Sequence, residues 1–189
     1  DFGVPPDKAQ DNFTDPESRI MKTSYGCDQC YNGQIAVDED SQLIVAMTLS
    51  NHAADNAELI PLVDEVESQL ETRPKEVLAD AGYRAEETFQ TLETRGIDAY
   101  ISLGREGKQS SVGAHLEASS RMAQKLATER GKKRYRRRKA IVEPVFGWIK
   151  GLLGFRRFSF RGEQKARHEW ALVCLALDLK RFHTLRAAT

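Results

Sequence analysis

The chain has 189 residues, of which 40% are hydrophobic and 30% are charged, a composition typical of a globular domain. No apolar run is long enough to span a membrane, so we expect no membrane partner and no signal peptide. The three cysteines are too few for a disulfide framework, and we expect Cys27, Cys30 and Cys174 to be reduced.

The formal net charge is zero, but the charges are divided unevenly along the chain. Residues 1–100 contain 7 Lys and Arg against 21 Asp and Glu, whereas residues 101–189 contain 21 against 7. A cationic half of this kind favours a surface that binds a polyanion such as nucleic acid. The alternative is that the two halves fold together and neutralise each other.

The first part of the chain predicts an irregular segment, a hairpin and a helix. Residues 1–33 carry prolines, glycines and many polar side chains, and we predict them to be irregular. Two short apolar runs, at 34–38 and 43–47, predict a β-hairpin. Asp55 has the spacing of a helix cap, and the helix predicted after it has an apolar face made of Leu59, Leu62, Val63, Val66 and Leu70.

The middle of the chain predicts short strands that alternate with helices. Strands are predicted at 76–79 and 98–103, with a helix at 86–95 between them. Residues 104–120 are rich in Gly, Ser and charge and are predicted to be a loop. Helices are then predicted at 122–130, 139–153 and 163–186, the last with the apolar anchors Trp170, Leu172, Val173, Leu177 and Phe182. This order indicates a mixed α/β layer fold.

Asp80 is the first candidate site residue, because it stands directly after the predicted strand 76–79 and before the predicted turn Ala81-Gly82-Tyr83. A carboxylate at the end of a buried strand is costly unless it is paired or binds a metal ion. The carboxyl end of a strand is also a usual place for a ligand. Asp80 therefore needs a partner that the rest of the sequence should identify.

The densest cationic segment is KKRYRRRK, residues 132–139. It comprises Lys132, Lys133, Arg134, Tyr135, Arg136, Arg137, Arg138 and Lys139. The segment leads into an amphipathic helix, on which Glu143, Gly147 and Lys150 share a face away from the apolar stripe. Pro144 is tolerated in a first turn, so we predict that the regular helix begins near Glu143. The alternatives are a solvated charge run or localisation signal, and a surface glutamate paired with Lys150 or an arginine.

Residues 154–162, GFRRFSFRG, interleave phenylalanine with arginine. Arg156 and Arg157 have the chemistry to bind phosphates, and aromatic faces stack on unstacked bases. The alternative is that the phenylalanines are core residues and the arginines lie at the rim.

Three segments together resemble the DDE transposases of bacterial insertion sequences, whose catalytic core has a ribonuclease H-like fold. The segments are YNGQIAVD at 31–38, LADAGY at 78–83 and RKAIVEPVFGWIK at 138–150, and the resemblance spans roughly residues 11–186. It implies an α/β fold in which helices flank a ribonuclease H-like mixed sheet. The domain would occupy residues 34–189 after an irregular segment at 1–33, with a loop or insertion at 104–130.

The resemblance also implies residue roles. Asp80 matches the second catalytic aspartate and Glu143 the catalytic glutamate, and both would bind metal. Lys150 matches a lysine that contacts DNA near the transposon end. Tyr135 and Arg138 resemble a tyrosine and an arginine that precede the glutamate, although the arginine lies four residues before the glutamate in many members and Arg138 lies five before Glu143. The cofactor would be Mg²⁺ or Mn²⁺, at a two-metal site in the complete protein.

One departure from the family pattern concerns the first catalytic aspartate, which sits on a strand before the hairpin. No strand ending in an acid is predicted before Gln34, so we expect a C-terminal fragment that lacks the first strand and the first aspartate. Asp38 is the first residue to test as a third carboxylate.

The resemblance implies metal-dependent DNA strand cleavage and strand transfer of an insertion sequence. The expected partners are transposon ends and target DNA, bound by a homo-oligomer in the cytoplasm, in association with the nucleoid. Three alternatives remain open: a catalytically inactive remnant that only binds DNA, a nuclease of the same fold without strand transfer, and an α/β domain whose basic run is only surface.

Overall fold

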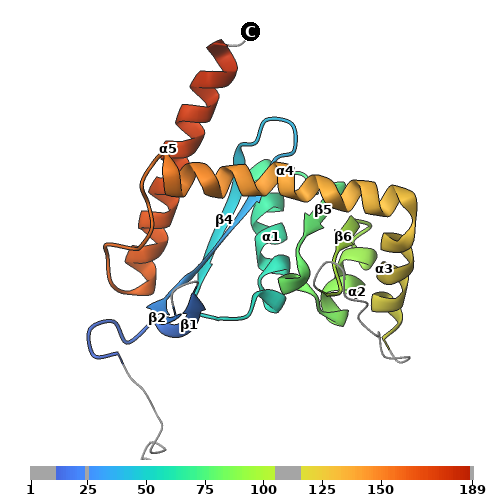
Figure 1. The fold of residues 1–189 in the computed structure, drawn as a ribbon, viewed down its shortest axis with the longest axis horizontal. Coiled ribbons are helices and arrows are strands. Elements are labelled where there is room, and N and C mark those ends of the chain that lie inside the picture. Colours follow the sequence, from blue (N-terminus) through green and yellow to red (C-terminus); the bar gives the residue numbers. More distant parts are fainter. Residues whose placement is uncertain (1–11, 24–25, 105–115, 188–189) are drawn as a thin grey trace, which may run out of the picture.

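The computed structural model describes residues 12–23, 26–104 and 116–187, and it confirms the mixed α/β fold class (Figure 1). Along the described chain, four strands come first, strands and helices then alternate, and helices make up the rest. The elements are β1 (Arg19–Thr23), β2 (Gly26–Cys30), β3 (Asn32–Val37), β4 (Ile44–Ser50), the 3₁₀ turn η1 (Asp55–Ala57), α1 (Leu59–Leu70), β5 (Glu76–Ala79), η2 (Ala81–Tyr83), α2 (Glu86–Thr94), β6 (Asp98–Ile101), α3 (Glu117–Ala127), α4 (Glu129–Gly151) and α5 (Glu163–Ala187).

The strands form three separate pairs. β3 and β4 are the predicted hairpin, paired antiparallel with Ile35 opposite Met47. β5 and β6 are parallel neighbours, with α2 between them in the chain. β1 and β2 form an antiparallel pair within the segment predicted to be irregular, so that prediction was wrong for these strands. Their residues are mostly exposed, and exposed strands lack the apolar alternation by which a sequence reveals a half-buried strand.

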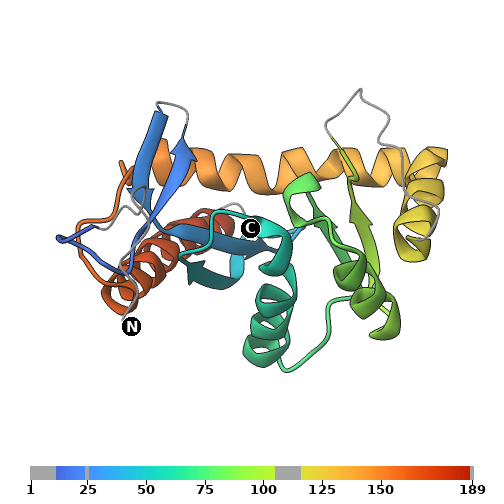
Figure 2. The same ribbon diagram turned by 90° about the horizontal axis from the view of Figure 1, so that it is seen from below.

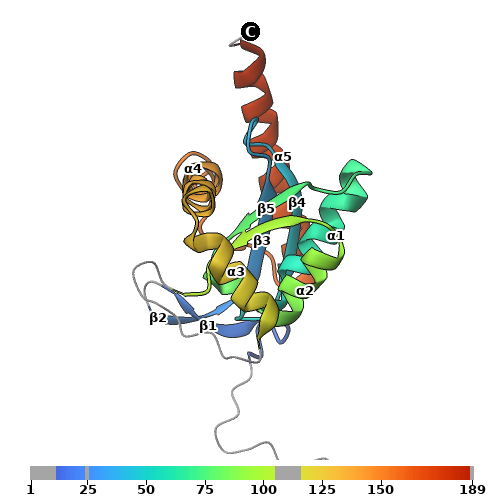
Figure 3. The same cartoon turned by 90° about the vertical axis from the view of Figure 1, so that its right-hand side faces the viewer.

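The elements are arranged in layers, which Figure 3 shows with α4 end-on. α4 lies on one side of the strands, and α1 and α2 lie on the other. One apolar cluster joins β5, β6, α1, α2 and α3, with Phe89, Leu92 and Ile101 almost fully buried. A second cluster joins the β3–β4 hairpin to α4 and α5, and includes Val145 and Trp170. Seen from below, the orange α4 runs along one side of the strand pairs (Figure 2).

The basic segment is part of α4, which corrects the predicted helix start near Glu143. α4 begins at Glu129, where the Thr128 hydroxyl caps it by accepting from the Gly131 N–H. The helix also continues through Pro144. Pro144 has no N–H for the carbonyl of Ala140, four residues earlier, and Gln42 of the hairpin turn supplies the missing donor at 3.0 Å. Gln42, from a distant segment, therefore provides the hydrogen bond that the helix lacks at the proline.

The remaining predictions are confirmed in part. The strand at Glu76–Ala79 has the predicted bounds, and four of the five predicted apolar positions of α1 are buried, whereas Leu70 is exposed. Most of the predicted loop, residues 105–115, lies outside the described residues, but α3 begins within it at Glu117. Within the described ranges, no helix has both the length and the apolar character to cross a bilayer.

Candidate active site and nucleic-acid interface

Asp80 stands at the point where β5 ends and η2 begins. The buried Ala79 ends the strand, and the Asp80 side chain is half exposed. Its Oδ1 accepts a hydrogen bond from the Gly82 N–H at 2.8 Å and so caps the turn. The carboxylate is thus held by the backbone on one side and open to solvent on the other, as a ligand-binding group requires.

A second carboxylate, Asp55, lies beside Asp80 across Gly82. A methyl group added at Gly82 would come within 2.8 Å of Asp55 Oδ2 and 3.0 Å of Asp80 Oδ1, so both carboxylates border the same small space. Asp55 was predicted to cap α1, but that cap position is taken by Glu58, which makes no side-chain cap. Sequence reasoning therefore missed Asp55 as a neighbour of Asp80, because the helix-cap spacing offered a local explanation for it.

A partly buried polar network links the 3₁₀ turns η1 and η2 to β3. The Asp55 Oδ1 accepts from Asn32 Nδ2 at 2.6 Å and from Gln34 Nε2 at 2.9 Å. The Gln34 Oε1 in turn accepts from the Tyr83 hydroxyl, and only 5% of Gln34 is exposed. Burial, followed by the charges of Asp55 and Asp80, raises the pKa of Tyr83, so its hydroxyl keeps its proton and donates. The network positions Asp80 through the residues that follow it.

Arg138 is the cation nearest to Asp80 in the described part of the chain. One of its guanidinium nitrogens lies 4.0 Å from Asp80 Oδ2, and only 17% of the side chain is exposed. Its Nε is buried and has no hydrogen-bond partner among the described residues, and the guanidinium lies 5.5 Å from the Tyr135 ring centre. The structure thus brings two predicted site residues, Arg138 and Asp80, together.

Glu143 lies on the outer face of α4. Ile141 and Val145 are buried toward the strands, and Glu143, two residues from each, is exposed. Because each helical residue turns about 100°, Glu143 lies roughly 160–200° around the axis from both. The structure therefore does not bring Glu143 to Asp80 in this arrangement.

The cations of the basic segment divide between two faces of α4. Arg134 faces inward and pairs with Glu39 of the hairpin turn and with Glu76 of β5, and Arg137 lies 2.7 Å from the same Glu39. The hydrogen bond from Arg134 lowers the pKa of Glu39. An exposed stripe, which we call the outer face, carries Lys132, Arg136, Lys139, Glu143, Gly147 and Lys150. Their spacing of three or four residues places them along one line of the helix.

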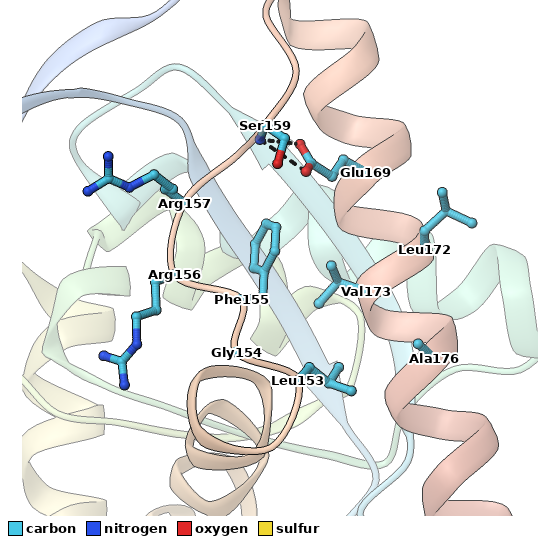
Figure 4. A pocket seen from close by; sticks show the side chains of 10 residues that line it. All are labelled: Leu153, Gly154, Phe155, Arg156, Arg157, Ser159, Glu169, Leu172, Val173 and Ala176. Carbon is cyan, nitrogen blue, oxygen red and sulfur yellow. Dashed lines mark hydrogen bonds between the residues drawn. The ribbon is translucent and has the colours of Figure 1, made fainter.

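The segment after α4 contributes two more arginines. Arg156 and Arg157 are exposed and lie beside a groove of about 680 Å³ between this segment and α5 (Figure 4). Phe155 and Phe158 pack against Trp170, so the alternative of core phenylalanines holds for these two, while Phe160 is 55% exposed. The groove thus has an apolar wall and a cationic rim.

A family model described as a transposase DDE domain matches residues 9–179. The chain belongs to the DDE transposase family. Neither the comparison with curated proteins nor the comparison with solved structures gives a match. Membership confirms the resemblance drawn from the three sequence segments, and it confirms the ribonuclease H-like fold class. At the level of the family, the function is transposition and the partner is DNA.

The divalent metal that DDE transposases use fits these residues only in part. Asp80 and Asp55 offer the hard carboxylate oxygens that Mg²⁺ and Mn²⁺ prefer. Within residues 12–23, 26–104 and 116–187, however, no group of three Asp, Glu, His or Cys is placed to hold a metal ion. Asp38 does not supply the third, since it follows β3 at the hairpin turn, whereas Asp55 contacts Asn32 and Gln34 at the opposite end of that strand.

Two further acids of the transposase domain have a structural role that the sequence did not reveal. Asp15 accepts from the Tyr31 hydroxyl at 2.7 Å and from the Gly162 N–H at 3.2 Å, and Glu17 accepts from the Glu163 N–H at 2.6 Å. Both carboxylates therefore cap the start of α5 from the other end of the chain. Gly162 and Glu163 lie almost 150 residues away from these acids, so no local pattern could identify the caps.

Proposed function

We propose that this chain binds DNA along the outer face of α4 and serves metal-dependent strand cleavage and strand transfer of an insertion sequence, with Asp80 and Glu143 as catalytic and metal-binding residues. The observation that supports this most is the position of Asp80. It is an accessible carboxylate at the end of a strand, braced by the network of Gln34 and Tyr83 and beside a second carboxylate, Asp55.

The chemistry requires hard oxygen ligands and a neutralised DNA backbone. A pair of divalent cations, when bound, activates the attacking oxygen and stabilises the leaving oxygen of the phosphodiester. In this chain, Asp80 supplies carboxylate oxygens and Arg138 balances its charge. The arrangement of α4 leaves Glu143 on the opposite side, so a site shared by Asp80 and Glu143 requires α4 to pack differently on the strands.

DNA would contact the cations that the fold leaves exposed. Among the predicted DNA-binding residues, Lys132, Lys133, Arg136, Lys139 and Lys150 on α4, and Arg156 and Arg157 after it, are exposed. Arg134 and Arg138 are mostly buried beside acids of the protein, so their part in DNA binding is secondary. Arg137, like Lys132, pairs with an acid but stays exposed and is available to DNA. We further propose that the transposase acts as a homo-oligomer on DNA in the cytoplasm, associated with the nucleoid.

A second candidate is a transposase remnant that binds DNA without cleaving it. The orientation of Glu143 favours this candidate, because bringing Glu143 to Asp80 would turn the buried Ile141 and Val145 into solvent. Both candidates use the same outer face and differ only in metal-dependent chemistry.

Nicking and joining of DNA distinguish the two candidates. The chain is incubated with supercoiled plasmid and a labelled duplex in Mg²⁺ or Mn²⁺, beside Asp80→Asn, Glu143→Gln and the exposed control Asp40→Asn. Metal-dependent nicking that both site variants lose and the control retains supports the catalytic proposal. Nicking without joined products indicates a nuclease. Salt-sensitive DNA retention without nicking establishes the binding-only remnant and overturns the catalytic proposal.

A further inference from the structure

α5 is apolar on two opposite faces, only one of which is covered. Its inner face packs against the hairpin and α4 through Ala166, Trp170, Cys174 and Leu177, all of which are at most 5% exposed. Leu172 and Phe182 were predicted as anchors of the same core, and the structure corrects this. They are 63% and 55% exposed and lie on the other side of the helix.

The uncovered face has the spacing of a coiled-coil seam. Its four large side chains follow one another at intervals of three, four and three residues, the spacing of heptad positions that meet a partner helix. Leu175 is 54% exposed and Leu179 is 63% exposed, so the seam is continuous from Leu172 to Phe182. Figures 1 and 3 show that the C-terminal part of α5 extends beyond the other elements. We call Leu172, Leu175, Leu179 and Phe182 the outer seam.

From this seam we infer that two copies of the chain associate through α5, with the helices antiparallel. The inference deepens the homo-oligomer of the proposed function and names its surface, while its evidence is independent of metal or DNA. The seam is complementary to itself, because in a two-fold antiparallel pair Leu172 meets Phe182 of the second copy and Leu175 meets its Leu179.

The charges of α5 set the direction of the pair. Around its C-terminal half, Lys180, Arg181 and Arg186 outnumber Asp178, whereas the first two turns balance two glutamates, Glu163 and Glu169, against Lys165 and Arg167. A parallel pair would bring two cationic ends together, at an electrostatic cost. An antiparallel pair places each cationic end beside the neutral first turns of the other copy and so avoids this cost.

The groove shown in Figure 4 lies beside the Leu172 end of the seam. Leu172, Val173 and Ala176 form its α5 wall, and Leu153 and Phe155 line the side opposite. In the antiparallel arrangement this is the end that receives Phe182 of the second copy, so the groove offers a large side chain an apolar place to bury.

The exposed area indicates a weak dimer. A phenylalanine presents ~150–250 Å² and a leucine somewhat less, so four such side chains that are more than half exposed leave on the order of 400 Å² of apolar surface on each copy. Patches of this size mark interaction sites, but a standard interface buries about 800 Å² on each partner. Association should therefore depend on concentration in the micromolar range.

Sedimentation of the full chain without DNA or metal, from about 1 to about 100 µM, tests the inference. The wild type should shift from monomer to dimer, and Leu175→Glu with Leu179→Glu should raise the dissociation constant at least ~10-fold with an unchanged circular dichroism spectrum. The control Leu70→Glu places the same charge at an exposed leucine of α1 and should dimerise as the wild type does. A wild type that stays monomeric throughout, or a double variant that dimerises normally, overturns the inference. Neither result bears on nicking or DNA binding.

Cross-linking tests the direction of the pair. Leu172→Cys and Phe182→Cys proteins, both with Cys27 and Cys30 replaced by serine, are mixed and oxidised. The antiparallel pair predicts that the disulfide joins position 172 of one copy to position 182 of the other. A disulfide between two copies of position 172 overturns the antiparallel arrangement.

Discussion

The guanidinium of Arg138 lies 4.0 Å from the carboxylate of Asp80, although 58 positions separate them in the chain. The contact joins the helix α4 to the end of β5, and it gives Asp80 a positive neighbour while the rest of its surface stays open. Any cation that binds Asp80 must therefore compete with Arg138, and DNA phosphates must compete with Asp80 for Arg138. If Asp80 binds metal and Arg138 contacts DNA, as proposed, the pair limits both interactions.

Arg134 is predicted to contribute to stability rather than to DNA affinity. Arg134→Gln leaves Glu39 and Glu76 without their shared cation and should lower the free energy of unfolding by roughly 1–3 kcal/mol, less than for a fully buried pair because the side chains are about a quarter exposed. Urea unfolding measures this. Arg136→Gln, on the outer face, should change stability by less than ~0.5 kcal/mol.

The effect of Arg134→Gln should also depend on pH. The hydrogen bond from Arg134 lowers the pKa of Glu39 in the folded state, so the stabilisation is present above the ordinary glutamate pKa of about 4.3 and is lost as pH falls through the lower folded value. The difference between wild type and variant should be largest near pH 7 and shrink below about pH 4. A difference that grows on acidification would contradict this account of the pair.

Gly82 is predicted to be intolerant of any side chain. A methyl group there would lie within 2.8 Å of Asp55 Oδ2 and 3.0 Å of Asp80 Oδ1, so Gly82→Ala must push the two carboxylates apart and should destabilise the protein by about 1–3 kcal/mol. Gly147→Ala is the matched control, because nothing lies within 4 Å of its added methyl group. In a helix that substitution should stabilise by up to ~1 kcal/mol. Thermal melts of both variants compare them directly.

The outer face of α4 is predicted to set the salt dependence of DNA binding. Arg136→Gln with Lys139→Gln should weaken binding to all sequences alike and reduce the slope of log K against log salt by about 2, one for each phosphate contact. Lys75→Gln with Lys165→Gln removes the same charge from other surfaces and should leave the slope nearly unchanged. Equal effects of the two pairs would show that only net charge matters.

Asp178 is predicted to make stability fall as pH rises. Burial raises its pKa, partly offset by the hydrogen bond that its carboxylate accepts from the Ile44 N–H at 2.8 Å. A carboxyl with a raised folded pKa binds its proton more tightly in the folded state, so its contribution is most favourable at low pH and is lost from about pH 4 upward. Asp178→Asn keeps the acceptor without the charge and should raise the melting temperature at pH 7 more than at pH 4.

The sequence predicts local features of this fold well and long-range features poorly. The strand that ends at Ala79 and the hairpin follow from apolar patterns within a few residues. The basic segment forms the first half of α4 because Glu39 and Glu76, 95 and 58 positions before Arg134, neutralise its inner side, and no local pattern contains that information. The same holds for Gln42, which completes the helix at Pro144, and for Asp55, whose partners lie on β3.

For the candidate site too, the sequence predicts which residues take part better than it predicts how they are arranged. Residue types, spacing and the family resemblance singled out Asp80, Glu143 and the cations of α4 as candidates, and the family match at 9–179 covers the segments that carry them. Which cations face outward depends on how α4 packs on the strands, and that orientation separates Arg134 and Arg138 from the outer face. Spacing alone places Glu143 opposite the apolar stripe, but only the packing of β5 shows on which side Asp80 lies.

Binding of Mn²⁺ to the chain, followed by water-proton relaxation, tests most directly whether Asp80 is a metal ligand. The account predicts that the wild type binds Mn²⁺ weakly and that Asp80→Asn lowers this affinity at least ~5-fold. Asp40→Asn should leave the affinity unchanged, and Arg138→Gln should raise it because a neighbouring positive charge is removed. If Asp80→Asn binds Mn²⁺ as tightly as the wild type, Asp80 is not a metal ligand in this chain and the catalytic proposal fails.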